Sequence, residues 1–575
     1  MSKKAAFFIP YYWTPHLEID LELIHRHVSS GDEVTIYVCE GELTTCYSNP
    51  DHTAEICRLC KSRRRSGLNL VGVAESVKTK NFVNLKEGDL PTFQKYKGRK
   101  VSTVSELLDI RLENCFIGRK VFSDLVNTQK EHDPDLEQFS DLITKSIESC
   151  ALVYLSFKNN FLENFPDIFY TFNGEFVVAH PAIAAAEHRG VSFAVHDRSA
   201  GVMNRYTVVH NDSINSLPHW KRQIDRAWAN SDESEDQKAL IADQWFSDRA
   251  RSQKQGWFSF TTEQSEGLLP SQFAANKINL AIYNSSDWEF VGLDDYKPPF
   301  YKNQNDGLLR LAESLQHNPE FEIYLRVHPH LKEKKNSQTD FISNHLVDRF
   351  PNFHVIDADS KVSSYALMLH SNLVMTFGST IGIEAAYNRK PSLLLGHALY
   401  EDLDACVIPN SHEEAVDWIR NRQYEMTQDE LYRRHKNAAK YGYFNQTLGT
   451  PYNLFEQTDI LEVKYVVDNS GAKIDNLPTP YQSGLKKELA TRVELHSPTS
   501  FNPLVKVVQE LEEVLEGVMA ENISLKAELH QAMRDLGASK QNVEQLQTLK
   551  RHRYVNRATE LKMSIGRRLR NFLSR

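Results

Sequence analysis

Two short elements in the middle of the chain carry side chains suited to binding phosphate. A strand-like run, Ile323-Tyr324-Leu325-Arg326-Val327, is followed by His328-Pro329. A second apolar run, 372–377, leads into Gly378-Ser379-Thr380 and then into a helical pattern that carries Glu384. Backbone N–H groups at the start of a helix attract anions, and an arginine and a histidine at a neighbouring strand end add a fixed cation and a titratable ring. Together these features predict a pocket for the phosphates of a nucleotide.

The elements around this pocket alternate between strand-like and helix-like patterns. Apolar runs occur near residues 278, 321, 353, 372 and 391, and helical patterns near residues 305, 340, 362, 379 and 412. This alternation predicts a parallel sheet covered by helices on both faces. We therefore assign residues 266–465 to an α/β lobe of Rossmann type. Helices expected over 427–440 and 452–462 would pack back across the lobes.

The N-terminal part of the chain shows the same rhythm, which predicts a first Rossmann-like lobe over residues 1–265. Its expected start is a strand at 5–10, a helix at 17–29 that ends at Gly31, and a strand at 33–38. Further expected elements are a strand at 151–155, a helix at 180–189, a strand at 191–196 and a polar helical stretch at 213–256. The fold class expected from both halves is α/β.

The segments LRVHPH and TFGSTIGIEAAYNRKPSLLLG resemble the donor-binding lobe of GT-B glycosyltransferases. They are most similar to the group that builds bacterial capsule and lipopolysaccharide polysaccharides, which includes Kdo- and sialic-acid-transferring enzymes and has the teichoic-acid polymerases as relatives. The segments FNGE, 172–175, and YNSSDWEF, 283–290, resemble pieces of the same group. Glu175 stands where that group commonly has arginine. The resemblance covers roughly residues 5–440.

The resemblance implies a two-lobed, metal-independent enzyme without a cofactor. It would transfer a sugar from a nucleotide-sugar donor to a polysaccharide or lipid-linked glycan acceptor, as part of a growing capsule or O-antigen. The implied donor-binding residues are Ser285, Arg326, His328, Gly378, Ser379, Thr380 and Glu384, with Glu384 placed to contact the ribose or the donor sugar. The HP element makes a CMP-sugar the first expectation and a UDP-sugar the second. Two alternatives stay open: a polyol-phosphate transferase of teichoic-acid type, and a non-catalytic scaffold.

A base that accepts the proton of the attacking hydroxyl is expected in the first lobe. The loop at 11–18 follows the first strand, and an imidazole or carboxylate there can take that proton. His16, Glu18 and Asp20 are candidates, and His196-Asp197-Arg198 after a later strand is another. We name His16, Asp20 and Asp197 as the catalytic candidates, although no spacing selects among them and a single histidine is often structural.

Several other polar clusters are interpreted as structural. Asp357-Ala358-Asp359 and Asp402-Leu403-Asp404 have the form of a metal-binding Asp-x-Asp, but we interpret both as surface turns and expect no metal. Cys39, Cys46, Cys57 and Cys60 are close in sequence and could bind zinc, yet they lack a second CxxC. Buried free thiols are the preferred interpretation. Arg63-Arg64-Arg65 is interpreted as a solvated charged face rather than a phosphate contact.

The composition and the C-terminal region predict where the protein is located and what it associates with. A net charge of −9 argues against nucleic-acid binding, and the short apolar start is expected to be a strand in a cytoplasmic protein. Residues 466–500 are expected to be a linker, and heptads over 501–550 with Asn522 at an a position predict a parallel coiled-coil homodimer. Residues 551–575 carry eight basic residues and one acidic residue. This tail predicts contact with the inner-membrane surface.

Overall fold

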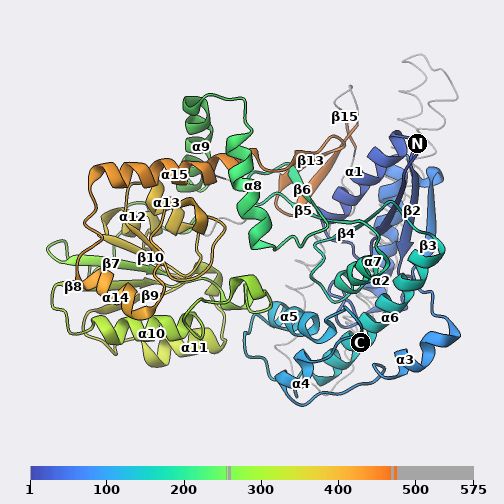
Figure 1. The fold of residues 1–575 in the computed structure, drawn as a ribbon, viewed down its shortest axis with the longest axis horizontal. Coiled ribbons are helices and arrows are strands. Elements are labelled where there is room, and N and C mark those ends of the chain that lie inside the picture. The colour runs from blue at the N-terminus through green and yellow to red at the C-terminus, as the bar shows by residue number, and fades with distance from the viewer. Residues whose placement is uncertain (1, 254, 257–260, 468–471, 475–575) are drawn as a thin grey trace, which may run out of the picture. The chain divides into compact units, whose positions relative to one another are not determined.

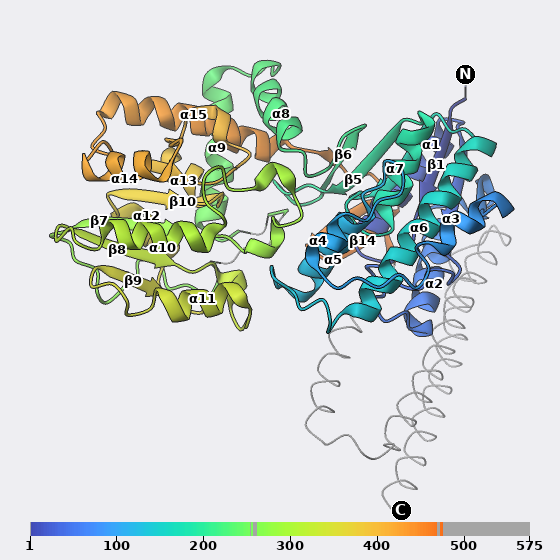
Figure 2. The ribbon, with the colours of Figure 1, turned by 60° about the horizontal axis from the view of Figure 1, so that its bottom comes forward.

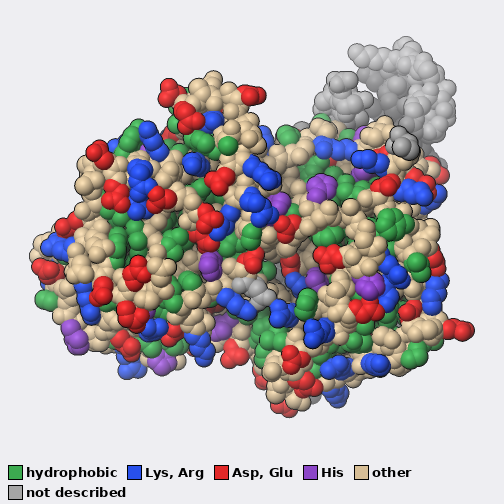
Figure 3. All heavy atoms as spheres, viewed as in Figure 1, with side chains coloured by type: hydrophobic (Ala, Val, Ile, Leu, Met, Phe, Trp, Pro, Cys, Tyr) green, Lys and Arg blue, Asp and Glu red, His purple; other side chains and the backbone are tan. Residues whose placement is uncertain are grey.

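The computed structural model describes residues 2–253, 255–256, 261–467 and 472–474. The linker beyond residue 474, the coiled coil at 501–550 and the basic tail at 551–575 lie outside the described residues. In the part of the chain that is described, no helix is long and apolar enough to cross a membrane. Acidic and basic side chains are interspersed over the face drawn in Figure 3.

The first lobe is built on a seven-stranded sheet with the order β12-β6-β5-β4-β1-β2-β3. Its strands are β1 Lys4–Phe8, β2 Glu33–Val38, β3 Val77–Asn81, β4 Ile168–Phe172, β5 Phe193–Arg198, β6 Arg205–His210 and β12 Thr450–Pro451. Strands β1 to β5 pair in parallel, whereas β6 and β12 are antiparallel additions at one edge. The first strand, which we expected at 5–10, therefore ends at Phe8.

Apolar side chains on both faces of this sheet are buried. Ala6 and Phe8 of β1 pack into a core with the helices α4 Val104–Leu108, α5 Ile117–Gln129, α6 Ser140–Glu163 and α7 Ala179–Arg189. Ala5 and Phe7 point to the other face, where α1 His16–Ser29 and α2 Ala54–Leu70 cover the sheet (Figure 1). Because side chains alternate along a strand, a sheet covered on both sides has strands that are apolar throughout. The lobe also contains η1 Ala74–Ser76, η2 Glu87–Asp89 and α3 Leu90–Gln94.

The strand expected at 151–155 is wrong, because these residues lie inside α6. The apolar run is continuous in sequence, and such a run fits a fully buried helix as well as a strand. All five of its side chains are buried in the structure. Because every residue of the run is apolar, its pattern could not distinguish a helix from a strand.

The second lobe is built on a five-stranded parallel sheet with the order β11-β10-β7-β8-β9. Its strands are β7 Ile278–Tyr283, β8 Phe321–Arg326, β9 Phe353–Ile356, β10 Leu373–Thr376 and β11 Ser392–Leu394. Helices α10 Gln304–Leu315, α11 Ser337–His345 and α14 His412–Arg420 pack on one face. Helices α12 Ser364–His370 and α13 Ile381–Tyr387 pack on the other (Figures 1 and 2). The expected alternation of parallel strands and helices is confirmed.

Strand order reverses at β7, because β8 continues on one side of it and β10 lies on the other. In open parallel sheets, ligands bind at the carboxyl edge beside such a reversal. The segments that follow β7, β8 and β10 meet at this edge. They include the short helices η3 Asp287–Glu289 and η5 Pro329–Leu331, while η4 Asp294–Tyr296 and η6 Glu401–Leu403 lie further along the chain.

Helices outside the two sheets connect the lobes. The polar stretch at 213–256 forms α8 Leu217–Ala229 and α9 Glu235–Ala250, and both pack against α15 Gln428–Thr447. The chain then returns to the first lobe, where β12 pairs with β6. The helix expected at 452–462 is wrong, because β13 Phe455–Asp459 and β14 Glu462–Val467 form an antiparallel sheet with β15 Ala472–Ile474. Phe455 and Gln457 are buried whereas Glu456 is not, which is the period of a strand.

Candidate functional site

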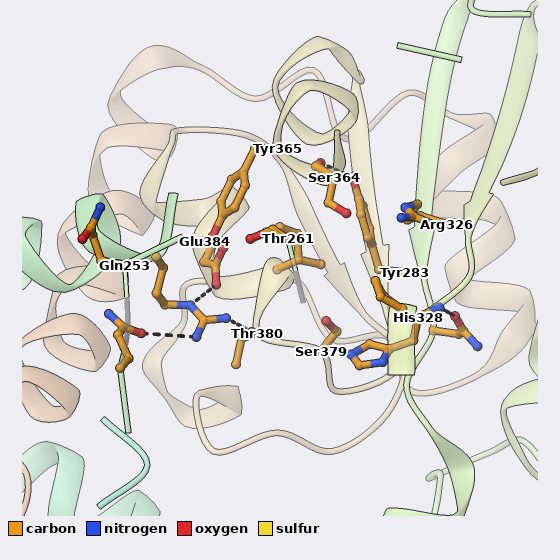
Figure 4. Close-up of a pocket in the computed structure, with 15 residues that line it drawn as sticks. Gln253, Thr261, Tyr283, Arg326, His328, Ser364, Tyr365, Ser379, Thr380 and Glu384 are labelled. Carbon is orange, nitrogen blue, oxygen red and sulfur yellow. Dashed lines mark hydrogen bonds and ion pairs between the residues drawn. The ribbon is translucent and has the colours of Figure 1, made fainter. Parts of the chain in front are cut away.

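A cavity of about 100 Å³ opens at the carboxyl edge of the second sheet, beside β7 (Figure 4). Five of the seven expected donor-binding residues line it, and they come from two separate segments. These are Arg326, His328, Ser379, Thr380 and Glu384. The other lining residues are Arg249, Gln253, Gln255, Thr261, Tyr283, Asn284, Pro329, Ser364, Tyr365 and Ile381. The structure thus brings most of the predicted group together, and the roles of these residues stay predictions.

Ser285 and Gly378 lie beside the cavity and shape the turns around it. Ser285 is buried; its N–H donates to Gln304 Oε1 at 2.8 Å and its carbonyl accepts from Gln338 Nε2 at 2.8 Å. Gly378 has a φ of +117°, and a Cβ there would lie 2.7 Å from the carbonyl oxygen of His397. Only glycine accommodates both constraints at this turn.

His328 is a neutral hydrogen-bonding group in this structure rather than a cation. Burial lowers the pKa of His328 to about 4, although Glu289 opposes the shift. The ring nitrogen Nδ1 accepts from the N–H of His330 at 3.2 Å, so the proton of the neutral ring resides on Nε2. The backbone N–H of His328 donates to Asn284 Oδ1 at 2.9 Å, which fixes the end of β8 against that of β7.

The guanidinium of Arg326 hydrogen-bonds to backbone carbonyl oxygens. Its side chain is nearly fully buried, and Nη1 donates to the carbonyl oxygens of Val327, at 3.2 Å, and of Asp357. Nη2 donates to the carbonyl oxygen of Ser360 at 3.0 Å. In Figure 4, Arg326 lies on the far side of Tyr283 from Glu384. The guanidinium therefore fastens the turn at 357–360, which is also the location of the exposed Asp357 and Asp359.

The hydroxyl groups at the start of α13 are available to the cavity. Thr380 occupies the N-cap position without a capping hydrogen bond from its side chain, so neither Ser379 nor Thr380 is explained as a helix cap. Both residues are half-buried. The carbonyl oxygen of Ser379 accepts from the hydroxyl of Tyr400 at 2.5 Å, which holds the turn in place. With seven residues, α13 supplies only a short helix dipole.

Arg249 is a lining residue that the sequence did not reveal. It lies at the end of α9, and its Nε is 2.6 Å from Glu384 Oε1 while Nη2 donates to Thr380 Oγ1 at 3.0 Å. Its guanidinium lies 5.0 Å from the centre of the Trp245 ring. Burial lowers the pKa of Arg249, but Glu384, Tyr365 and Tyr441 together raise it, and the net shift is upward. Tyr365, Gln253, Gln255 and Thr261 are further lining residues that we did not predict.

His16 and Asp197 come together at the carboxyl edge of the first sheet. His16 Nδ1 lies 3.5 Å from Asp197 Oδ1, and Asn173 Nδ2 donates to Asp197 Oδ2 at 3.1 Å. The His16 ring stacks on Phe172 with 3.7 Å between the ring centres. Burial, with Arg198 and His196, lowers the pKa of His16 well below its usual value. Nδ1 is buried and makes no hydrogen bond within the described part of the chain, so Asp197 lies beside the ring without being bonded to it. A neutral imidazole can accept a proton, and its lowered pKa makes it a weaker base than a free histidine.

Asp20 and Glu18 are fully buried and are bound to other protein groups. Asp20 Oδ1 lies 2.8 Å from His196 Nε2, and Oδ2 accepts from the hydroxyl of Tyr11. Glu18 forms an ion pair with Arg63. In this arrangement Asp20 fastens α1 to β5 next to the His16–Asp197 pair, and a direct contact of Asp20 with an acceptor would require the lobe to open.

Two interpretations of clusters near the N-terminus have different outcomes. The solvated face expected for Arg63-Arg64-Arg65 is wrong for its first two members, which are 0% and 5% exposed. Arg64 Nη1 donates to the carbonyl oxygen of Ile9 at 3.3 Å, so α2 is held to the first strand by its arginines. All seven cysteines are free, but Cys39, Cys46, Cys57 and Cys60 are half-buried rather than fully buried. No group of three or more metal-ligating side chains occurs within the described residues. Burial raises the pKa of Cys46 to about 11 and that of Cys60 to about 12.

Residues 296–404 match the sequence model of a family described as "Capsule polysaccharide biosynthesis protein". The matched segment contains the HP element and the turn that precedes α13, but neither Arg249 nor His16. The match bears out the expected likeness to proteins of capsule polysaccharide synthesis over this segment. Comparison with curated proteins gives no match.

Solved structures with a detectable likeness share little sequence with this chain. A KpsC β-Kdo 2,4-transferase of Thermosulfurimonas dismutans is 15% identical, over 54% of this chain and 84% of that one, with a TM-score of 0.31. The β-Kdo 2,7-transferase of the same organism is 13% identical, over 59% and 89%, with a TM-score of 0.29. A UDP-GlcNAc 2-epimerase from Neisseria meningitidis is 11% identical, over 77% and 98%, with a TM-score of 0.26. At these TM-scores the likenesses carry no argument about activity.

Proposed function

We propose that this chain transfers a sugar from a nucleotide-sugar donor to a growing bacterial capsule polysaccharide. One observation carries the proposal: a single cavity at the reversal of the second sheet is lined by His328, Ser379, Thr380 and Glu384, within the segment that matches the capsule family. Parallel α/β sheets bind nucleotides at this position. The cavity is polar on the side of these residues, as a phosphate site requires.

The cavity would stabilise the nucleotide phosphate as it leaves the sugar. Negative charge grows on the phosphate oxygen while the glycosidic bond to the donor breaks, and preorganised hydrogen-bond donors lower that barrier. The Nε2–H of His328 and the hydroxyls of Ser379 and Thr380 are such donors. Because His328 is neutral, its contribution is a hydrogen bond that needs no change of protonation near neutral pH.

We assign the base to the His16–Asp197 pair of the first lobe. The neutral ring of His16 would take the proton of the acceptor hydroxyl as that hydroxyl attacks the anomeric carbon of the donor. Asp197, 3.5 Å from Nδ1, would stabilise the imidazolium that results. Asp20 then acts through His196 as a positioning residue, in place of the catalytic role that we expected for it.

The charges of the cavity suit an anionic donor. Among the described lining residues, Arg249 and Arg326 are cationic and Glu384 is anionic, which leaves one net positive charge. CMP-sugars are the first candidates because of the HP element, and UDP-sugars are the second. The acceptor would be a polysaccharide or lipid-linked glycan at the inner-membrane surface, reached through the basic tail of a coiled-coil homodimer.

A thermal-shift panel of CMP, CDP, UDP, GDP and TDP without added metal tests this function. A ligand at about 100 times its dissociation constant stabilises the folded state by roughly 2.7 kcal/mol, which is readily measured. We expect CMP to raise the melting temperature most, and a His328→Ala/Ser379→Ala double variant to lose most of that shift. If no nucleotide stabilises the folded wild-type protein, the chain is not a nucleotide-sugar transferase.

A further inference from the structure

We infer that Arg249, rather than Arg326, is the arginine that binds the donor phosphate, and that Glu384 holds Arg249 in position for it. The inference rests on the proposed function, because it identifies the cation of the same site. Arg249 comes from α9, outside the segment that matches the capsule family.

Arg249 keeps hydrogen-bonding capacity that faces the cavity. A guanidinium has five N–H donors in one plane. Toward the described residues, Nε is used on Glu384 at 2.6 Å, Nη2 on Thr380 at 3.0 Å, and Nη1 reaches Gln255 Oε1 at only 3.5 Å. Tyr365 also hydrogen-bonds with the guanidinium. At least one donor therefore remains, and 26% of the side chain is exposed. The spare donor, together with the one in the long Gln255 contact, can bind two oxygens of one phosphate.

Arg326 lacks these properties although it lines the same cavity. Its residue is 2% exposed, and both hydrogens of Nη1 and one of Nη2 are used on the carbonyl oxygens of Val327, Asp357 and Ser360. Its Nε has no hydrogen-bond partner among the described residues but is fully buried. Arg326 is therefore far less accessible to a phosphate than Arg249, whose side chain is 26% exposed. Its role is to hold the turn at 357–360.

Glu384 and Trp245 together fix the plane of the Arg249 guanidinium. Glu384 is 3% exposed in its side chain and binds Nε, the donor nearest to the arginine stem. The Trp245 ring lies against the guanidinium at 5.0 Å. An arginine held from behind by a buried carboxylate needs no reorganisation when an anion arrives, which is the condition for effective electrostatic stabilisation. Glu384 is thus a positioning residue, and a contact with the donor ribose is not needed to explain its burial.

The test compares a nucleotide with its nucleoside in matched variants. CMP and cytidine, or UDP and uridine if UDP binds the wild type better, are titrated by calorimetry into wild type, Arg249→Gln, Arg326→Gln and Arg251→Gln. Arg251 is exposed and directly follows α9, so it controls for a change of charge in this region. We expect Arg249→Gln to weaken nucleotide binding about tenfold to a hundredfold and to leave nucleoside binding within twofold. Arg251→Gln should change neither.

Arg249→Gln leaves Glu384 buried without its partner, and that variant could unfold. The double variant Arg249→Gln/Glu384→Gln removes both charges and lets the two amides pair, and it should show the same selective loss of nucleotide affinity while it melts near the wild type. Arg249→Lys should recover part of the affinity, because it restores charge without the fork.

The outcomes separate this inference from the proposed function. A wild type that binds neither nucleotide overturns the function and the inference with it. Suppose that the wild type binds CMP, and that the double variant still binds CMP more tightly than cytidine by the same factor as the wild type. The proposed function then stands, and the role of Arg249 is refuted. The same holds if only Arg326→Gln loses that preference for CMP while it remains folded.

Discussion

Replacing Arg63 by methionine tests the buried ion pair that holds the loop in front of α1. Arg63 is fully buried, donates to the carbonyl oxygen of Tyr12 at 2.7 Å and to Thr14 Oγ1 at 2.8 Å, and pairs with Glu18. Methionine fills similar space but leaves the Glu18 carboxylate with Thr14, at 3.3 Å, as its side-chain partner among the described residues. Removing one member of a buried ion pair costs about 3–5 kcal/mol. We expect the first lobe to lose about that much of its free energy of unfolding.

Hydrogen exchange of the β1 and β2 amides measures this loss in the first lobe alone. Arg65→Met is the matched control, because Arg65 lies on the same helix and is exposed. Exposed substitutions of this kind usually change stability by less than about 0.5 kcal/mol. The double variant Arg63→Met/Glu18→Gln removes the unpaired charge and should recover part of the loss.

The pH dependence of the stability of Arg63→Met tests the same ion pair. Burial raises the pKa of Glu18 in spite of Arg63, and the pKa will rise further without Arg63. A carboxyl whose pKa is higher in the folded than in the unfolded state destabilises the fold as the pH rises toward the folded value. Arg63→Met should therefore lower the free energy of unfolding by more at pH 7 than at pH 5. If Arg63→Met costs no more than Arg65→Met at either pH, the ion pair does not stabilise the lobe.

Two other predictions concern the first lobe and the C-terminal region. Burial raises the pKa of Asp124 to about 7, so its ionisation disfavours the folded state as the pH rises above the usual carboxyl value. Asp124→Asn, which can still accept from the N–H of Val177, should gain melting temperature over the wild type at pH 8 and gain less at pH 5; an equal change at both would contradict this. If residues 501–550 form a parallel coiled coil, light scattering should give a dimer for the full chain and a monomer after truncation at residue 490. A monomeric full chain would contradict it.

The second lobe could be predicted from the sequence because its strands are short, apolar and bounded by turn residues. The segments at His328-Pro329 and Gly378-Ser379-Thr380 follow two such strands, so their meeting at one sheet edge followed from the parallel order. Arg249 could not be found in this way, because no local pattern tells which face of α9 contacts α13. Nor did the sequence distinguish a buried Arg63 from a solvated one, since only the fold brings it to Glu18.

The chain passes between the lobes twice, once through 211–277 and once through 448–449, and the second passage is tightly fastened. Arg205 Nη1 donates to the carbonyl oxygens of Thr447 and Gly449 at 2.9 and 3.1 Å, and Ser199 Oγ donates to that of Leu448 at 3.2 Å. A Cβ at Gly201 would lie 1.9 Å from the carbonyl oxygen of Asn445, so the loop between β5 and β6 packs directly against the end of α15. These contacts tie the end of α15 to the first lobe. Any displacement of that end of α15 would therefore be passed directly to the loop at 199–205.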